Sequence, residues 1–362
     1  MDKFAFVIHT TDLNLFSLAI DEPNLTKKRK QLIEQVFTWL PPLNISHITG
    51  IRSITGKEIE GYFIYCTLLP EQLLNLNQQF VLKKIVEGGK IAQDLGAKII
   101  GLGAYAANVG RKGILVEKNL KIPVTTGTTY TVVVTVEATL KAMNEVGMEL
   151  KKARVAIIGA SGGIGSTIAQ ILADKITDIT LVARNQNRLN NLANLISRVN
   201  NKVKLQITDN IKKAVSSANV VFVSTTSPST LIDSEDINPG TIICDISQPR
   251  NVSPEVADKR SDVLVIDGGI VKVPGDVNFN FYFGLPPKLA YACIAETMIL
   301  TLEGLFESYS IGGNISLEKT EKIAKLAKKH GFQLSTIRSF GKNVRTEQFD
   351  KLREIIRLRE KL

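Results

Sequence analysis

The sequence has few cysteines, few histidines and no long apolar run. Three scattered cysteines in 362 residues form neither a disulfide framework nor a zinc site. The three histidines are also far apart, so we expect no metal centre. No apolar run reaches the roughly 18 residues that cross a bilayer, and the apolar stretch in residues 1–9 is too short for a signal peptide. These absences predict a cytoplasmic protein with free thiols.

Positive charge is concentrated near the C-terminus. The formal net charge is +10, and residues 319–362 hold 13 Lys and Arg against 5 Asp and Glu. This basic tail is either a solvated helical surface or a docking surface for an acidic protein, a phosphate group or a membrane face. Charge alone favours the solvated surface, and we expect no nucleic-acid partner.

The order of apolar segments predicts an α/β fold in three parts. Residues 1–148 mix strand-like and helix-like segments and form an N-terminal α/β substrate domain. Residues 149–284 alternate continuous apolar strands with helices, which is typical of a doubly wound parallel sheet covered on both faces. Residues 285–362 are mainly helical. We also expect a helix through the valine run 131–134, with its N-cap at Thr128 or Thr129, and a helix opened by Pro286 and Pro287.

A glycine-rich loop joins the first strand of the middle domain to a helix. Its residues are Gly159, Ala160, Ser161, Gly162, Gly163, Ile164 and Gly165. Glycines at such a turn let the backbone approach a pyrophosphate, and the helix N-terminus supplies free N–H groups. A tight structural turn is the alternative, but the strand before and the helix after favour a Rossmann-like dinucleotide site.

The end of the next strand indicates which dinucleotide binds. A protein that binds NAD usually has an acidic residue there, whereas this chain has Arg184, Asn185 and, one helical turn later, Arg188. Two guanidinium groups fit a 2′-phosphate, so we predict NADPH; an unrelated pair of surface arginines is the alternative. Thr225 and Thr226, which follow a later strand, complete the predicted cofactor site.

Cys293 lies in a segment with small neighbours, among them Ala290, Ala292 and Ala295. Small residues allow a ligand to approach a thiol, but they equally allow helices to pack closely. From these residues alone, Cys293 can be interpreted either as an inert buried cysteine or as a nucleophile.

From about residue 55 to residue 332 the sequence resembles the long-chain acyl-[acyl-carrier-protein] reductases best known from cyanobacteria. Besides the glycine loop and residues 183–189, the matching stretches are Thr55-Gly56-Lys57, Leu69-Pro70-Glu71, Leu102-Gly103-Ala104, Thr125-Thr126-Gly127, Asp267-Gly268-Gly269, Ala292-Cys293-Ile294-Ala295-Glu296, Leu302-Glu303-Gly304 and His330-Gly331-Phe332. The chain departs from the family at Tyr130, where the family has histidine, in residues 273–287, in the first 40 residues and in its longer basic tail.

The resemblance implies a catalytic role for Cys293. In that family this cysteine takes the acyl group as a thioester, and NADPH reduces the thioester to a fatty aldehyde. It further implies substrate contacts from Thr126, Gly127, Thr128, Gly268 and Gly269. The implied partners are an acyl carrier protein or a coenzyme A thioester, and an enzyme that consumes the aldehyde. Contact of the basic tail with a membrane surface is an expectation from its charge and not from the resemblance.

Two other functions stay open at this stage. One is a reductase of a small hydroxy or keto acid that resembles shikimate dehydrogenase and needs no nucleophile. The other is an NADP-binding sensor without catalysis, which would bind the cofactor and turn over no thioester.

Overall fold

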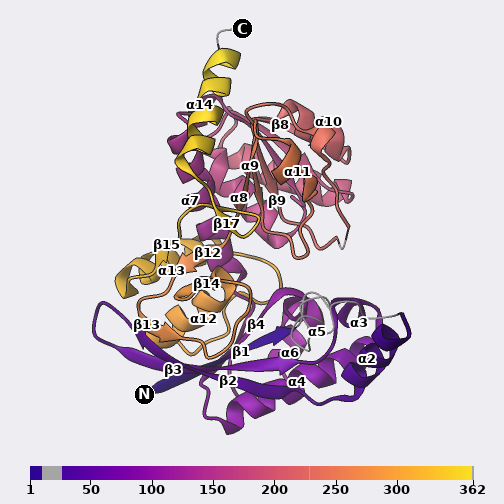
Figure 1. Cartoon of the computed structure of the whole chain (residues 1–362), viewed down its shortest axis with the longest axis vertical. Helices are drawn as coiled ribbons and strands as arrows, with labels where there is room; N and C mark the ends of the chain where they lie inside the picture. Colours follow the sequence, from indigo (N-terminus) through magenta and orange to yellow (C-terminus); the bar gives the residue numbers. More distant parts are fainter. Residues whose placement is uncertain (10–26, 228, 361–362) are drawn as a thin grey trace. The chain divides into compact units, whose positions relative to one another are not determined.

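The computed structural model describes residues 1–9, 27–227 and 229–360, and these form two compact units (Figure 1). Unit 1 comprises residues 1–130, 272–314 and 322–333. Unit 2 comprises residues 131–271, 315–321 and 334–362. The chain therefore passes between the units several times. No helix in the described ranges is long and apolar enough to cross a membrane.

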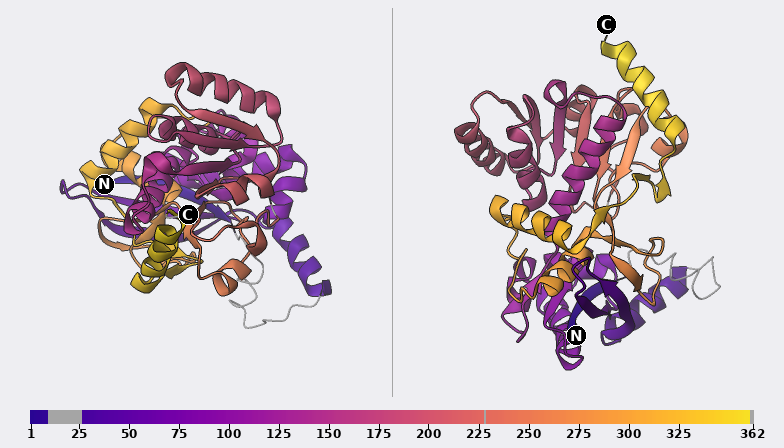
Figure 2. Two further views of the ribbon diagram at one scale, coloured as in Figure 1. Left: turned by 90° about the horizontal axis from the view of Figure 1, so that it is seen from above. Right: turned by 90° about the vertical axis from the view of Figure 1, so that its left-hand side faces the viewer.

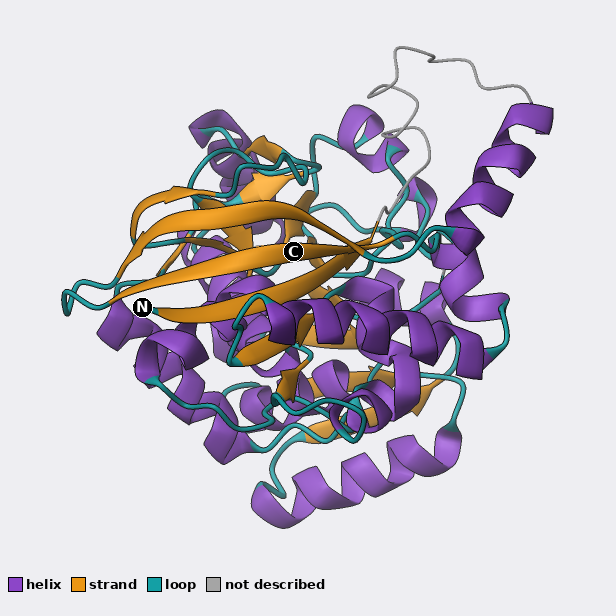
Figure 3. Ribbon diagram, turned by 90° about the horizontal axis from the view of Figure 1, so that it is seen from below, coloured by secondary structure: helices purple, strands orange, loops and turns teal. Residues whose placement is uncertain are grey.

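Unit 1 is built on a six-stranded mixed sheet with the order β13-β2-β3-β1-β4-β5, whose strands lie side by side in Figure 3. Strands β1, β3, β4 and β5 are parallel, and β2 and β13 join antiparallel at one edge. The sheet strands are β1 (Asp2–His9), β2 (Leu43–Arg52), β3 (Glu58–Cys66), β4 (Ile99–Leu102), β5 (Val124–Thr125) and β13 (Gly275–Asn278).

Helices cover both faces of this sheet. Ala5 and Val7 of β1 point to a core that includes Val81 and Ile85 of α4. On the other face, the α-carbon of Gly101 in β4 lies against Phe6 and the hydroxyl of Thr297 in α12. The helices are α2 (Lys27–Trp39), α3 (Pro70–Asn75), α4 (Gln78–Asp94), α5 (Val109–Lys112), α6 (Ile114–Glu117) and α12 (Ala292–Glu303), with a 3₁₀ turn at Ala104–Asn108.

Unit 2 is built on a six-stranded, entirely parallel sheet with the order β11-β10-β9-β6-β7-β8. Numbered along the chain, this is the 3-2-1-4-5-6 order of a Rossmann fold, read from the other edge. The strands are β6 (Arg154–Ile158), β7 (Asp178–Val182), β8 (Lys204–Thr208), β9 (Val220–Val223), β10 (Ile242–Asp245) and β11 (Leu264–Asp267). The predicted α/β fold with a doubly wound parallel sheet is confirmed.

Apolar side chains alternate between the two faces of this sheet and form a core on each. Val155 and Ile157 of β6 face one core, and Ala156 and Ile158 face the other. The helices that surround the sheet are α7 (Thr128–Glu145), α8 (Gly163–Ala173), α9 (Gln186–Val199), α10 (Ile211–Ser217), α11 (Glu255–Lys259) and α14 (Thr346–Glu360), the last drawn in yellow in Figure 2, with 3₁₀ turns at Leu150–Lys152 and Ser234–Asp236.

The C-terminal residues are shared between the units instead of forming a third one. Helix α12 packs on the sheet of unit 1, whereas Leu352 and Ile356 of α14 lie in a core of unit 2. Residues 272–284 also belong to unit 1, because β13 pairs with β2. The remaining elements are β12 (Ile270–Lys272), β14 (Leu289–Tyr291), α13 (Leu317–His330), β15 (Gln333–Leu334), β16 (Arg338–Ser339) and β17 (Lys342–Asn343).

Two sequence predictions about helices have different outcomes. The valine run 131–134 is helical, as predicted, but α7 begins at Thr128, so its cap falls before the expected threonines. The prediction that a helix begins at Pro286 and Pro287 was wrong about where the helix starts. Lys288 has a left-handed φ of 64° and residues 289–291 form strand β14, so the helix begins only at Ala292.

Candidate functional site

Cys293 is the second residue of α12, directly at the N-terminus of the helix. The chain enters through Tyr291, whose extended backbone (φ −67°, ψ 144°) ends β14. Backbone N–H groups at a helix start are free to face a sulfur or a developing negative charge. Of the three cysteines, Cys293 alone is not fully buried. Cys66 and Cys244 lie inside the two sheets.

The turn that contains Thr125, Thr126 and Gly127 packs tightly against Cys293. Gly127 has a left-handed φ of 70°, and a β-carbon at this position would lie 2.2 Å from the α-carbon of Cys293 and 2.4 Å from its β-carbon. Only glycine fits a position that combines this backbone angle with this approach. The predicted substrate residues Thr126, Gly127 and Thr128 are therefore in the immediate surroundings of Cys293.

A fully buried carboxylate, that of Glu296, holds this turn in place. Its Oε1 accepts hydrogen bonds from the hydroxyls of Thr125 (2.5 Å) and Ser310 (2.6 Å), and its Oε2 accepts one from the backbone N–H of Tyr130 (2.7 Å). The Thr126 hydroxyl bonds to the carbonyl of Ser310. Glu296 thus ties α12 to the turn before α7 and to the segment after α12.

The surroundings of Cys293 disfavour its thiolate. Burial of the sulfur, with a contribution from the negative charge of Glu296, raises the pKa of the thiol to about 12, although the N–H of Ile294 acts in the opposite direction. Burial also raises the pKa of Cys66 to about 11 and that of Cys244 to about 12. Lys288, which lies five residues before Cys293, pairs with Asp276 at 2.6 Å.

The glycine loop of unit 2 has the geometry that a dinucleotide needs. Gly159 has a left-handed φ of 87°, and a β-carbon there would lie 2.6 Å from the carbonyl oxygen of Ser224. A β-carbon on Gly165 would lie 2.5 Å from the carbonyl oxygen of Gly159. Helix α8 begins after Gly162 and no side chain caps it, so its first N–H groups are left for a bound anion.

Arg184, Asn185 and Arg188 lie where β7 meets α9, and all three are exposed. The Asn185 side chain accepts a hydrogen bond from the N–H of Arg188 (3.0 Å) and so caps α9. The two arginines have no carboxylate partner in the described part of the chain. The loop and this pair follow adjacent strands at the carboxyl edge of the parallel sheet, where ligands of such sheets bind.

The remaining predicted residues have structural contacts in unit 2. The Thr225 hydroxyl bonds to Asn251 (2.5 Å), whereas Thr226 is exposed. Gly268 packs against Cys244, and Gly269 has a left-handed φ of 75°. Gly268 and Gly269 therefore belong to unit 2, while the other three predicted substrate residues lie beside Cys293 in unit 1.

Sequence reasoning missed Ser310, whose carbonyl accepts a hydrogen bond from the Thr126 hydroxyl in the turn beside Cys293 and whose hydroxyl donates to the Glu296 carboxylate. Ser310 is separated from Thr125 by 185 positions, and a lone serine near a glycine pair carries no signal of such a contact. Glu296 lies in one of the stretches that resemble the family, but the sequence does not indicate its bonds to the turn.

Comparison with known proteins gives matches of different extent. The family model of shikimate / quinate 5-dehydrogenase matches residues 141–268, a range that lies within unit 2. Among solved structures, L-tryptophan dehydrogenase from Nostoc punctiforme covers all of this chain and 90% of its own, with 14% identity and a TM-score of 0.39.

Two curated relatives match over most of the chain. Aminotransferase PigE from a Serratia strain is 26% identical over 353 residues, but the chain spans only 41% of its length. Long-chain acyl-[acyl-carrier-protein] reductase from Synechococcus elongatus is 30% identical over 308 residues, which are 81% of this chain and 87% of that protein. This identity over most of both sequences shows that the chain belongs to the family of the long-chain acyl-[acyl-carrier-protein] reductase, and so to a family of oxidoreductases.

Proposed function

We propose that this protein reduces a long-chain acyl thioester to a fatty aldehyde with NADPH, through an acyl group bound covalently to Cys293. The observation that carries this proposal is the position of Cys293: the one incompletely buried cysteine lies at a helix N-terminus, against a turn held by Glu296. The family membership supports the same reaction.

The residues of unit 2 fit the proposed cofactor. The loop from Gly159 to Gly165 leaves no room for β-carbons at its two ends, and the start of α8 offers uncapped N–H groups to a pyrophosphate. Arg184 and Arg188 would bind the 2′-phosphate that distinguishes NADPH from NADH. When bound, NADPH supplies the hydride that reduces the acyl group.

The chemistry asked of Cys293 is an acyl exchange. Its sulfur attacks the carbonyl carbon of the substrate thioester, the bond to the carrier sulfur breaks, and the carrier leaves as a thiol that takes up the proton lost from Cys293. The negative charge that develops on the carbonyl oxygen needs hydrogen-bond donors. N–H groups of the first turn of α12 and the hydroxyl of Thr128, in the turn beside Cys293, are candidate donors, whereas the Thr126 hydroxyl already donates to the carbonyl of Ser310.

The raised pKa of the Cys293 thiol places a condition on this step. At neutral pH the resting thiol keeps its proton, so the proton must leave as the carbon–sulfur bond forms. Acylation should therefore become faster as the pH rises.

The match to the shikimate / quinate dehydrogenase model favours a second candidate, a direct hydride-transfer reductase of a small hydroxy or keto acid. This match ends at residue 268 and does not include α12. It is therefore explained by the nucleotide-binding fold alone, and the thioester reduction remains the better supported function.

The test is to incubate the full chain with a long-chain acyl thioester in the absence of NADPH and to measure its intact mass. We expect one acyl adduct on the wild type and on Cys66→Ser, and none on Cys293→Ser, because a serine hydroxyl is a far weaker nucleophile than a thiolate. An equal adduct on Cys293→Ser, or none on the wild type at any pH up to 9, would contradict covalent catalysis.

A further inference from the structure

A cavity of about 240 Å³ opens at the edge of the unit 2 sheet opposite the glycine loop. Its lining comes from the start of β6, the residue before β9, the turn before β10 and the last turns of α14: Met148, Glu149, Lys152, Ala153, Arg154, Asn219, Gly240, Ile356 and Arg359. Arg154 begins β6 and the glycine loop follows its end. Five residues of strand separate them, which is roughly 16 Å, so the cavity is distinct from the predicted cofactor site.

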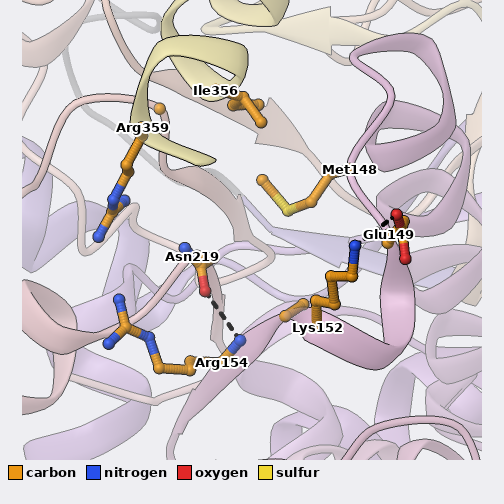
Figure 4. A pocket seen from close by; sticks show the side chains of 9 residues that line it. Met148, Glu149, Lys152, Arg154, Asn219, Ile356 and Arg359 are labelled. Carbon is orange, nitrogen blue, oxygen red and sulfur yellow. Dashed lines mark hydrogen bonds and ion pairs between the residues drawn. The ribbon is translucent and has the colours of Figure 1, made fainter. Parts of the chain in front are cut away.

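Nitrogen donors gather on one side of this cavity. Figure 4 shows the guanidinium groups of Arg154 and Arg359 on the same side, with the Asn219 side chain between them. The side-chain oxygen of Asn219 accepts a hydrogen bond from the backbone N–H of Arg154 (2.9 Å). The backbone N–H of Asn219 donates to the Arg154 carbonyl (2.8 Å). Since the oxygen is thus engaged, the amide nitrogen is the group left to donate to a ligand.

No carboxylate neutralises these arginines among the described residues. The acidic residue in the lining, Glu149, pairs with Lys152 at 2.8 Å, on the other side of the cavity in Figure 4. Within the described ranges, the guanidinium of Arg359 donates one long hydrogen bond, to the carbonyl of Pro239 at 3.3 Å. Burial, and next the charge of Arg154, hold the pKa of Arg359 below its ordinary value, so the two cations disfavour each other.

We propose that this cavity binds the phosphate group of a small molecule between Arg154, Arg359 and the amide of Asn219. Two planar guanidinium groups and an amide offer more N–H donors than the two oxygens of a carboxylate accept, whereas a phosphate has three terminal oxygens and a charge near −2. Met148 and Ile356 form an apolar wall beside these donors (Figure 4), and this wall suits the organic part of a phosphate ester.

The experiment is isothermal titration calorimetry of the full chain with inorganic phosphate and, separately, with phenyl phosphate, at an ionic strength kept constant with chloride. We expect saturable binding of phosphate that is weakened at least tenfold in Arg154→Gln and in Arg359→Gln. Arg357→Gln removes an exposed arginine from the same helix and should leave binding unchanged. Tighter binding of phenyl phosphate than of inorganic phosphate would identify an ester as the ligand. Equal affinities for the two would identify the free phosphate ion as the ligand.

Three results would overturn the proposal. Equal affinity in the wild type and in all three variants would mean a solvated arginine pair. Loss of binding only in Arg184→Gln would assign the phosphate to the predicted cofactor site. Benzoate that binds as tightly as phenyl phosphate would exclude a site selective for phosphate. Because Arg154 is exposed and Arg359 only half-buried, neither substitution removes a core side chain, and thermal unfolding of each variant verifies its fold.

Discussion

Glu296 lies one helical turn after Cys293, and this single residue has two opposing effects on the proposed site. Its carboxylate organises the turn through three hydrogen bonds, yet its charge raises the pKa of the thiol that the reaction needs. A glutamine keeps the shape of the side chain, and its oxygen can still accept from Tyr130 N–H, but its amide nitrogen cannot accept from the two hydroxyls. The substitution therefore removes the charge together with part of the hydrogen bonding.

We predict that Glu296→Gln lowers the pKa of the Cys293 thiol and speeds its alkylation by iodoacetamide at pH 8. In the wild type, the rate should rise about tenfold per pH unit from 7 to 9 without a plateau, because the thiol pKa lies near 12. Peptide mass spectrometry measures the rate. Glu303→Gln, on the same helix but bonded to Lys329 and His330, is the control. Equal alkylation rates of Glu296→Gln and Glu303→Gln at pH 8 would show that the Glu296 carboxylate does not act on the thiol.

In the proposed cofactor site, Arg184 is the residue that we expect to select NADPH over NADH. We predict that Arg184→Asp weakens NADPH binding at least roughly tenfold, while NADH binding changes much less, because only the 2′-phosphate loses a charged partner. Fluorescence titration with both cofactors measures this difference. Arg198→Asp, at the other end of α9, is exposed as well and should change neither affinity. A parallel loss of both cofactors in Arg184→Asp would make the residue structural.

At the scale of elements, three of the short stretches that carry the family resemblance meet in unit 1. They are the stretches that contain Thr55, Glu303 and His330. Buried His330, at the end of α13, has its Nδ1 3.0 Å from the Ser53 hydroxyl and its Nε2 2.9 Å from the Glu303 carboxylate. Ser53 in turn accepts a hydrogen bond from Thr55 N–H (3.1 Å). The imidazole thus joins α12, α13 and the loop between β2 and β3, a structural role that explains these stretches without catalysis.

We predict that His330→Gln destabilises the protein by about 1–3 kcal/mol at pH 7.5, because buried partners lose a hydrogen bond. Burial holds the pKa of His330 below 6.5, although Glu303 acts in the opposite direction. The unfolded chain therefore takes up a proton first as the pH falls below 6.5, and the wild type loses stability that the variant does not lose. Urea unfolding at pH 7.5 and 5.5 should show a smaller difference between the two at pH 5.5. A difference that grows on acidification would contradict this assignment.

The local sequence pattern predicted the strands and helices of unit 2 well, because the residues within each of these elements determine its secondary structure. The strand before Gly159, the loop and α8 follow from an apolar run, glycines and a helical period. The helix expected at Pro286 failed because a proline pair permits more than one backbone path. The left-handed Lys288 and the strand that follows are set by pairing with distant segments, which no local pattern contains.

At the scale of the whole molecule, sequence reasoning found the chemical groups but not the way they are held. Cys293 and the turn at Thr126 were connected only by the family resemblance, and the structure adds their direct packing. The network of Glu296, Ser310 and Thr125 joins positions up to 185 residues apart, so it depends on tertiary structure alone. The division of the C-terminal residues between two units also depends on long-range packing, and a linear division into domains cannot express it.

If the substrate of the proposed reaction is carried by an acidic carrier protein, the basic tail is the surface that we expect this protein to bind. Lys322, Lys325 and Lys328 are exposed on one side of α13, whereas the neighbouring Lys329 is bonded to Glu303 and is best left intact. We predict that reversing these three charges to glutamate raises the KM for an acyl-carrier-protein substrate roughly tenfold, because each exposed pair contributes about 0.2–1 kcal/mol. The KM for an acyl-coenzyme A substrate should rise less, and high salt should reduce the difference between the two substrates.

Steady-state kinetics at two salt concentrations measures both effects. Charge reversal of the exposed Lys83, Lys90 and Lys118 in the same unit is the control. If both triple variants and both substrates respond alike, the lysines of α13 form a solvated surface, and the carrier docks elsewhere.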